Sequence, residues 1–316
     1  MALDIIFLVI GVPILAKAAD QFVMGSVRVA SALRVSAIVI GAVVMGFGTS
    51  APEMVVSGIA AGGGDIDVGV GNIVGSNIAN LTLVLGVAGI VTAIVIPDAV
   101  LRREAPLSTA SLVVFAVLVQ DGLRRWEGLV LVVLMVAALT LILLNARDSD
   151  DAAAGGELGE LLDDDEPPNL PVESLRTLAG LAGTVGGAWL LVEGATGIAD
   201  EAGLSGGFVG LTLVAVGTSL PELVTTVLAA RQGQTDLIVG NLLGSNLFNS
   251  LAVGSVTALV GNGPLQDPDL DGVPIYMMLG VGFVAWAFMA NGKRIGRVEG
   301  AILLIAAFVC VPFLPR

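Results

Sequence analysis

The sequence contains no histidine and only one cysteine, Cys310. A single cysteine excludes an intrachain disulfide, and the two shortages together exclude a metal site built from thiolates or imidazoles. Any metal site in this chain must therefore use oxygen ligands, which suit hard cations such as calcium, magnesium and sodium.

Charged residues are also scarce. They make up 13% of the 316 residues, while hydrophobic residues make up 55% and the mean hydropathy is +0.94. Because a soluble domain carries about 25% charged residues, this composition predicts an all-α polytopic membrane protein. A spanning helix needs ~20 mainly apolar residues, and we count about ten such stretches. The predicted spans are 3–20, 36–60, 68–96, 106–120, 127–145, 174–192, 207–230, 237–260, 274–291 and 298–314.

The net charge of −14 must lie mostly in loops. Nine of the nineteen residues at 148–166 are acidic, and Pro167 and Pro168 follow them. This pattern predicts a flexible acidic linker at 148–172 between a first transmembrane repeat, 1–147, and a second, 173–316. The linker could sense or concentrate cations, but a solvated spacer is the interpretation we favour.

Basic residues divide unequally between the two sets of loops that the spans define. One side has ten: Arg28, Arg34, Arg102, Arg103, Arg147, Arg176, Arg231, Lys293, Arg294 and Arg297. The other side has three, Arg124, Arg125 and Arg316. Because cytoplasmic loops are enriched in lysine and arginine, both termini are predicted to be extracellular in the cell membrane, with the linker in the cytoplasm.

An internal repeat relates the two halves. Sliding the sequence by 169 residues aligns 41–80 with 210–249 without a gap, and the identical pairs include Glu53/Glu222, Asn72/Asn241 and Asn77/Asn246. Because each half holds five predicted spans, an odd number, the second copy must enter the membrane from the opposite side. The sequence therefore predicts two five-helix repeats of inverted topology, an architecture that places a substrate between the copies.

The repeat opens with GTSAPE at 48–53 and GTSLPE at 217–222. Pro52 lacks a backbone donor, so the carbonyls of Gly48 and Thr49 are predicted to lose their helical partners. Spacing of three and four residues puts Ser50 and Thr49 on the helix face of Glu53.

Three further polar faces follow the same spacing. The second copy repeats the first face with Thr218, Ser219 and Glu222, and four-residue spacing pairs Ser76 with Asn80 and Ser245 with Asn249. If the repeats pack about a pseudo-twofold axis, the four faces converge.

A buried ionisable residue costs ~2.5–3.5 kcal/mol on insertion scales and usually marks an ion pathway. Glu53 and Glu222 could instead form salt bridges with a lysine or arginine. Lys17 is the only candidate within a predicted span, and it cannot pair with both glutamates. Two carboxylates balance one calcium ion, whose shell accepts six to eight oxygens. Sodium would use the same oxygens, so the two ions should compete.

At these residues the sequence resembles the sodium/calcium exchanger family of the cation/calcium antiporter superfamily, prokaryotic type. The family's two alpha-repeats look like G-T-S-x-P-E followed by G-N-x-x-G-S-N, which are GTSAPE with GNIVGSN and GTSLPE with GNLLGSN in this chain.

The resemblance implies alternating access with no cofactor. It implies that Glu53 and Glu222, with the backbone carbonyls of Thr49 and Thr218, bind calcium. It also implies sodium sites built from the same residues with Ser50, Ser76, Ser219 and Ser245, and a central position for Asn80 and Asn249. Prokaryotic members often carry aspartate where this chain has Asn249, so a sodium stoichiometry cannot be copied from relatives.

Three functions remain to be weighed. The leading one is a secondary active antiporter that exchanges sodium for calcium, with both ions and the lipid bilayer as partners, no nucleic acid, and a monomeric chain. The second is a cation/proton antiporter that uses the same glutamates. An intramembrane hydrolase is disfavoured because the chain has no histidine and no repeated acid/base pair with a nucleophile, so the protein is not expected to be an enzyme.

Overall fold

A computed structural model describes residues 2–33, 37–148, 169–201, 215–267, 270 and 272–310. Most of the predicted acidic linker, together with Arg34 and Arg316, falls outside these residues, so its boundaries stay a prediction.

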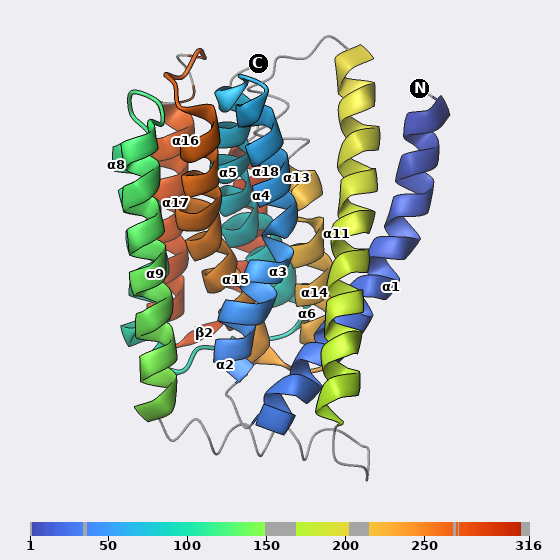
Figure 1. Cartoon of the computed structure of the whole chain (residues 1–316). Helices are drawn as coiled ribbons and strands as arrows, with labels where there is room; N and C mark the ends of the chain where they lie inside the picture. Colours follow the sequence, from blue (N-terminus) through green and yellow to red (C-terminus); the bar gives the residue numbers. More distant parts are fainter. Residues whose placement is uncertain are drawn as a thin grey trace.

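The described chain is almost entirely helical (Figure 1). The first half contains α1 (Ala2–Leu33), α2 (Ala37–Ile40), the π-helical turn η1 (Gly41–Met45), α3 (Gly46–Thr49), α4 (Ala51–Gly62), α5 (Ile66–Ala79), the π-helical turn η2 (Asn80–Val84), α6 (Leu85–Val91), α7 (Asp98–Arg102), α8 (Glu104–Leu118) and α9 (Arg125–Asp148). The second half contains α11 (Leu170–Glu201), α13 (Ala215–Thr218), α14 (Leu220–Arg231), α15 (Thr235–Phe248), the π-helical turn η4 (Asn249–Val253), α16 (Gly254–Gly261), α17 (Val273–Ala290) and α18 (Arg297–Cys310). Two short strands, β1 (Ile94–Val95) and β2 (Arg294–Ile295), pair antiparallel with Ile94 opposite Ile295.

Several of the described helices can cross a membrane. By length and composition, four qualify: Ile66–Val91, Arg125–Leu144, Thr235–Gly261 and Val273–Ala290. A fifth is added if Gly41–Thr49 and Ala51–Gly62, which meet at an angle of 42°, form one broken span. The 15-residue α8 is too short for this test. The predicted count of ten spans stays a prediction.

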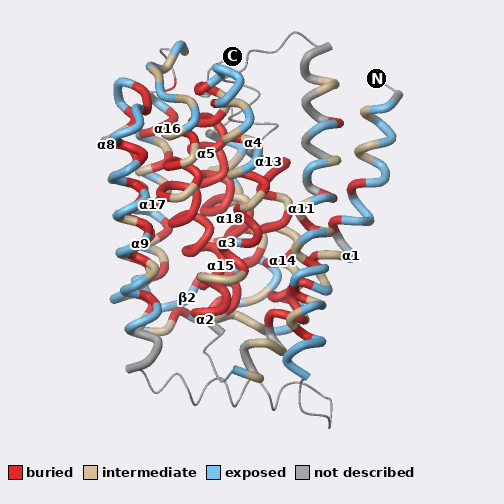
Figure 2. The backbone as a smooth tube through the Cα atoms, viewed as in Figure 1, coloured by how far each residue is buried: buried red, intermediate tan, exposed pale blue. Residues whose placement is uncertain are grey.

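Two rods lie at the centre of the molecule. The spans Ile66–Val91 and Thr235–Gly261 are 83% and 78% buried, whereas Arg125–Leu144 and Val273–Ala290 are 33% buried. In Figure 2 the buried colour follows α5 and α15, and exposed residues predominate on α9 and α1. The outer helices therefore turn much of their apolar surface outward, as lipid-facing helices do, while the two rods carry the interior.

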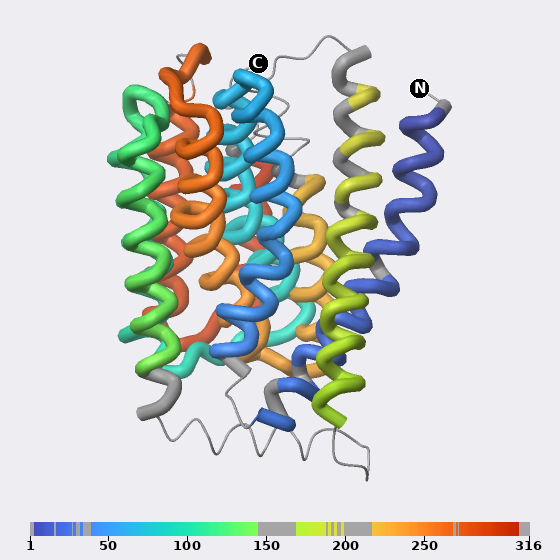
Figure 3. The backbone as a smooth tube through the Cα atoms, in the orientation of Figure 1, coloured from blue at the N-terminus to red at the C-terminus, as the bar shows by residue number. Residues whose placement is uncertain are grey.

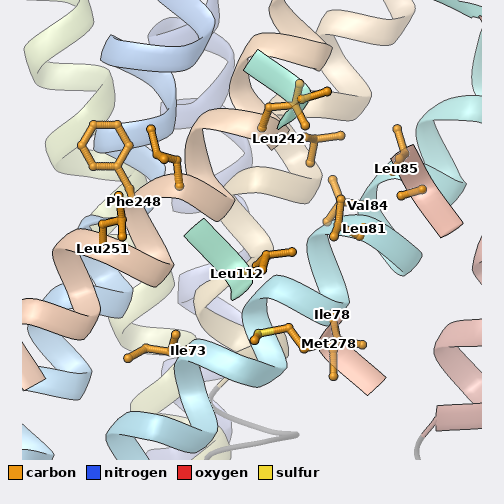
Figure 4. Packing of buried hydrophobic residues seen from close by; sticks show 14 of the residues in the cluster. Ile73, Ile78, Leu81, Val84, Leu85, Leu112, Leu242, Phe248, Leu251 and Met278 are labelled. Atoms are coloured by element: carbon orange, nitrogen blue, oxygen red, sulfur yellow. The ribbon is translucent and has the colours of Figure 1, made fainter. Parts of the chain in front are cut away.

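Aliphatic side chains fill the space around the rods. Ile78 and Leu81 on the first rod share a cluster with Leu112 of α8 and Met278 of α17 (Figure 4). Leu112 and Met278 are 1% and 0% exposed, so this packing excludes both lipid and water and fixes the rods against their neighbours.

Both glutamate-bearing helices begin in the same way. Pro52 and Pro221 each lie in the first turn of their helix, and Ser50 and Ser219 before them have nearly identical backbone angles, φ −81° with ψ 1° and 3°. A proline is tolerated in a first turn because its missing N–H would be unpaired there anyway. The prolines therefore start new helices instead of disrupting the middle of long ones.

This helix start corrects one expectation from the sequence. Backbone N–H groups at the end of α3 donate to the carbonyls of Gly46 and Gly48, so the Gly48 carbonyl keeps a partner. The chain turns at Ser50 before the proline is reached, and that turn supplies the donor. The expectation that the Thr49 carbonyl is freed stays a prediction.

The paired helices α1 and α11 run antiparallel in close contact (Figure 3). A Cβ on Gly180 would lie 2.5 Å from the backbone nitrogen of Phe22, and one on Gly187 would lie 2.6 Å from that of Leu15. The glycines thus let two backbones approach more closely than side chains would permit. At one end of the pair, Glu173 binds Arg28 at 3.0 Å and Arg176 at 3.1 Å.

Candidate ion-binding site

All ten residues predicted to hold ions are buried. Their exposed fractions are 0% to 2%, and they lie on the two rods, on the glutamate-bearing helices α4 and α14, and at the residues just before those helices. They are Thr49, Ser50, Glu53, Ser76, Asn80, Thr218, Ser219, Glu222, Ser245 and Asn249.

Thr49, at the end of α3, faces the second half of the chain. Its hydroxyl lies 3.3 Å from Oδ1 of Asn241 and 3.2 Å from Oγ of Ser245, both on α15, and it donates to the carbonyl of Met45 at 3.0 Å. The hydroxyls of Thr49 and Ser245 also lie near the carboxylate of Glu222, without a hydrogen bond to it. A residue from the first copy of the motif thus lies beside the glutamate of the second.

Thr218, at the end of α13, makes the corresponding contacts with the first half. Its hydroxyl lies 3.0 Å from Oδ1 of Asn72 and 3.5 Å from Oγ of Ser76, both on α5. The carboxylate of Glu53 interacts with Thr218, and Oγ of Ser219 lies 3.5 Å from its Oε1. Thr218, Asn72 and Ser76 are the residues that the offset of 169 aligns with Thr49, Asn241 and Ser245, so the two sets of contacts are equivalent.

The sequence reasoning did not assign a role to Asn72 and Asn241, although it recognised them as an identical pair. Nδ2 of Asn72 donates to Oγ of Ser57 at 2.9 Å, and Nδ2 of Asn241 donates to Oγ1 of Thr226 at 3.3 Å. Each amide therefore holds its oxygen toward the threonine of the opposite half. The one feature of the sequence that could have indicated this role is that the two asparagines are identical across the repeat.

Asparagines also meet where the π-helical turns begin. Nδ2 of Asn80 donates to Oδ1 of Asn246 at 3.2 Å, and Nδ2 of Asn77 donates to Oγ of Ser250 at 3.2 Å. Neither side-chain polar atom of Asn249 has a hydrogen-bond partner among the described residues. The two halves are therefore not equivalent at this level of the site.

Several buried oxygens of the cluster lack a hydrogen-bond partner among the described residues. They are Oγ of Ser50, Oε2 of Glu53, Oε1 and Oε2 of Glu222, and Oδ1 of Asn77, Asn80 and Asn249. An unsatisfied buried polar atom costs ~1–3 kcal/mol, and such a concentration of them in one cluster indicates that a ligand completes it.

The two glutamates are not neutralised by a basic side chain. In the described part of the chain neither of them forms a salt bridge, and no lysine or arginine is among the buried residues. Lys17, the one candidate partner in a predicted span, is exposed. Glu53 and Glu222 do interact with each other electrostatically, so a cation that enters the cluster meets two carboxylates.

Close backbone contacts position the cluster. A Cβ on Gly46 would lie 3.0 Å from the backbone nitrogen of Ser245, and one on Gly41 would lie 2.9 Å from the carbonyl oxygen of Leu237. Because these glycines have no side chain, η1 and α3 can lie directly against α15, which brings the Thr49 hydroxyl within reach of that helix.

The cross-repeat hydrogen bonds allow a test of stability. Valine has the same shape as threonine but no hydroxyl, so replacing Thr218 with valine removes its hydrogen bond to Oδ1 of Asn72. We expect this to cost ~1–3 kcal/mol, seen as a lower unfolding temperature of the purified protein in detergent. Thr140→Val is the matched control, because Thr140 is exposed on α9 and bonds only within its own helix. Equal losses from both variants would contradict a special role for the Thr218 contact.

The comparison with protein families decides what kind of protein carries this cluster. The model of the family described as "Sodium/calcium exchanger protein" matches residues 3–144 and 175–314. The chain belongs to the sodium/calcium exchanger family. Both halves are matched, and the part between the matches contains the acidic stretch.

Two relatives resemble the chain over most of its length. It is 35% identical to the putative antiporter CaxA of Alkalimonas amylolytica over 314 residues, 97% of each chain. It is 35% identical to the inner membrane protein YrbG of Escherichia coli over 271 residues, 84% of this chain and 82% of that one. With its apolar helices, the chain is accordingly a multi-pass membrane protein.

A solved structure is similar over the whole chain. The sodium-calcium exchanger NCX_Mj, soaked with 100 mM Na⁺ and 10 mM Sr²⁺, superposes with a TM-score of 0.83 at 29% identity, covering 100% of this chain and 99% of that one. The helical arrangement around the buried cluster is therefore the arrangement of a known exchanger.

Proposed function

We propose that the protein is a secondary active antiporter that exchanges sodium for calcium at the buried cluster. The observation that carries the proposal is the pair of fully buried glutamates, Glu53 and Glu222, which interact with each other and have no basic partner among the described residues. Family membership and the likeness to NCX_Mj support the same activity.

Calcium fits the pair by charge and by ligand type. Two carboxylates balance its two positive charges, and calcium accepts six to eight oxygens in a flexible shell. The oxygens without partners on Glu53, Glu222, Ser50 and Asn80 supply suitable ligands. The Thr49 and Thr218 carbonyls, which the family resemblance adds, would complete such a shell.

Sodium would occupy overlapping positions. The side chains of Ser50, Ser76, Ser219 and Ser245 are buried, as the glutamates are, and hydroxyl and amide oxygens suit a hard monovalent ion. Because both ions need the same carboxylates, their binding is mutually exclusive, and that competition couples the movement of one to the other.

Because Asn249 is neutral, the charge of the cluster is minus two, from Glu53 and Glu222. An aspartate at this position would add a third negative charge, and with it the need for a further cation or proton. We propose that Asn249 contributes a neutral amide at the centre of the site and that the site binds calcium with no leftover charge.

Alternating access is supported by the repeat and by a difference between its halves. Leu220 and Val224 of α14 pack against Leu15 of α1, whereas Ala51 and Val55, their counterparts 169 residues earlier, line an apolar cavity of about 500 Å³ between α4 and α11. One side of the site is thus closely packed and the other loosely packed. Exchanging these two arrangements would expose the ions to opposite sides of the membrane.

The remaining parts of the proposal concern architecture. In Figure 1, α1 begins at one end of the molecule, and α9 ends and α11 begins at the other. This supports five crossings in each half, hence ten spans in two inverted repeats, 1–147 and 173–316. We propose extracellular termini in the cell membrane, with the linker at 148–172 as a cytoplasmic spacer.

Vesicle transport separates this function from proton exchange. Sealed vesicles with the purified protein, loaded with sodium and diluted into sodium-free medium, should take up labelled calcium, and vesicles loaded with potassium should not. Uptake driven by a pH gradient and indifferent to sodium would overturn the proposal in favour of cation/proton antiport. Protein-free vesicles control for leakage.

A further inference from the structure

A second cavity lies at the end of the molecule where α6 finishes and α18 begins. Its volume is about 760 Å³, and it is lined by 91–93 and by residues between Asn291 and Glu299 that include Arg294 and Arg297. Both arginines and the β1–β2 pair lie in loops that the charge distribution assigns to the cytoplasmic side. The cavity is remote from the ion cluster and contributes no residue to it.

The charges around the cavity leave the arginines in excess. Lys293 binds Asp98 at 2.5 Å, and the hydrogen bond to Lys293 holds the pKa of Asp98 below its usual range, so these two groups neutralise each other. Glu299 lines the cavity too, but its Oε2 accepts the backbone N–H of Gly296 at 2.9 Å. Glu299 also interacts electrostatically with Arg294, so two guanidinium groups share one carboxylate and a net positive charge remains at the cavity.

The rim of the cavity is apolar and exposed. Val91 and Val298, which line the cavity, are 43% and 69% exposed. In a multi-pass membrane protein, exposed valines at a helix end meet acyl chains, and a polar cavity directly beside them lies at the depth of the headgroups. A free anion would make no use of such a rim.

The opposite end of the molecule contains a related arrangement. Leu123 pairs with Gly263 as Ile295 pairs with Ile94, and Glu127 accepts the N–H of Arg124 as Glu299 accepts that of Gly296.

The two ends differ at one side chain. Oδ1 of Asn262 accepts the N–H of Arg125, the first residue of α9, at 3.1 Å. The offset of 169 residues places Ala93 at the position of Asn262, and Ala93 has no side-chain acceptor to offer Arg297 at the start of α18. At the position where Asn262 caps α9, the smaller Ala93 lines the arginine-containing cavity instead.

We propose that this cavity binds the headgroup of an anionic phospholipid from the cytoplasmic leaflet. Arg294 and Arg297 would bind the phosphate oxygens, since guanidinium groups form strong charge-assisted hydrogen bonds with phosphate, and the acyl chains would lie along Val91 and Val298. Basic pockets between helices on this side of a membrane are suited to anionic headgroups. The proposal does not depend on which ions the protein exchanges.

Lipid binding to the full-length protein in detergent tests the proposal. Native mass spectrometry with phosphatidylglycerol, phosphatidylcholine or inorganic phosphate should show a preference for phosphatidylglycerol on the order of tenfold. Arg294→Gln with Arg297→Gln should remove that preference. Ala93→Asn, which restores an internal cap, should weaken it while retaining both arginines.

The opposite end supplies the matched control. Arg124→Gln with Arg125→Gln removes the same charge and should leave the preference unchanged. Equal binding of the two lipids, or full preference in the Arg294/Arg297 double variant, would overturn the proposal. Displacement of the lipid by inorganic phosphate at equal concentration would overturn the assignment to a lipid in favour of a free anion. Unfolding temperatures of all variants verify that each is folded.

Discussion

Glu53→Gln is expected to abolish sodium-dependent calcium uptake in sealed vesicles while leaving the protein folded. Glutamine has the size of glutamate but no charge, so one carboxylate, Glu222, would remain to balance two positive charges in a site with 0% exposure. Removing one partner of a buried charged pair costs ~3–5 kcal/mol, which is a loss of calcium affinity of about 100-fold or more.

Glu222→Gln should have the same effect, because the two glutamates occupy equivalent positions of the repeat. Glu193→Gln is the matched control: Glu193 is exposed on α11 and should transport at the wild-type rate. In ion-free buffer both site variants should unfold at or above the wild-type temperature, since each removes a buried charge without a basic partner among the described residues. Wild-type uptake by either site variant would refute the assignment of the ion site.

Gly244→Ala is expected to reduce both stability and transport, through packing instead of charge. A Cβ at this position would press on the carbonyl oxygen of Ala42 and lie 2.7 Å from its Cα, so the backbone of η1 would have to move away from α15. Overpacking of this kind costs ~1–3 kcal/mol. The displacement would also pull the Thr49 hydroxyl from Ser245, so calcium affinity should fall along with the unfolding temperature.

Gly280→Ala provides the comparison within the same chain. A Cβ on Gly280, inside α17, would have no neighbour within 4 Å, and alanine is favoured over glycine in a helix by ~0.5–1 kcal/mol. This variant should therefore be as stable as the wild type or slightly more so. If both alanine variants unfolded at the wild-type temperature, the close approach of η1 to α15 would not matter for stability.

The asparagines show how far pattern reasoning extends. Asn72 and Asn241 were visible as an identical pair, but their function depends on contacts with Thr218 and Thr49, 146 and 192 residues away in the chain. Spacing along one helix says which side chains share a face. It does not say which face of another helix lies opposite, so their contacts could not be predicted.

Asp67 gives a second example. It lies in the first turn of α5, where an anion is stabilised by the helix N-terminus. In the structure its two carboxylate oxygens also accept the backbone N–H groups of Gln266 and Asp267, at 2.9 and 2.8 Å. The aspartate thus anchors a loop from the other half, and no local pattern around position 67 points to that partner.

The amino-acid sequence by itself determined that this is a helical membrane protein with a repeated glutamate motif and oxygen ligands only. Composition and short-range spacing carry that information directly. Only the tertiary structure decided that the hydroxyl of Thr49 meets Asn241 and that of Thr218 meets Asn72, crossing between the halves. The physical reason is that these pairs form where glycine-lined backbones from distant segments come into contact, and such contacts depend on the packing of the whole chain.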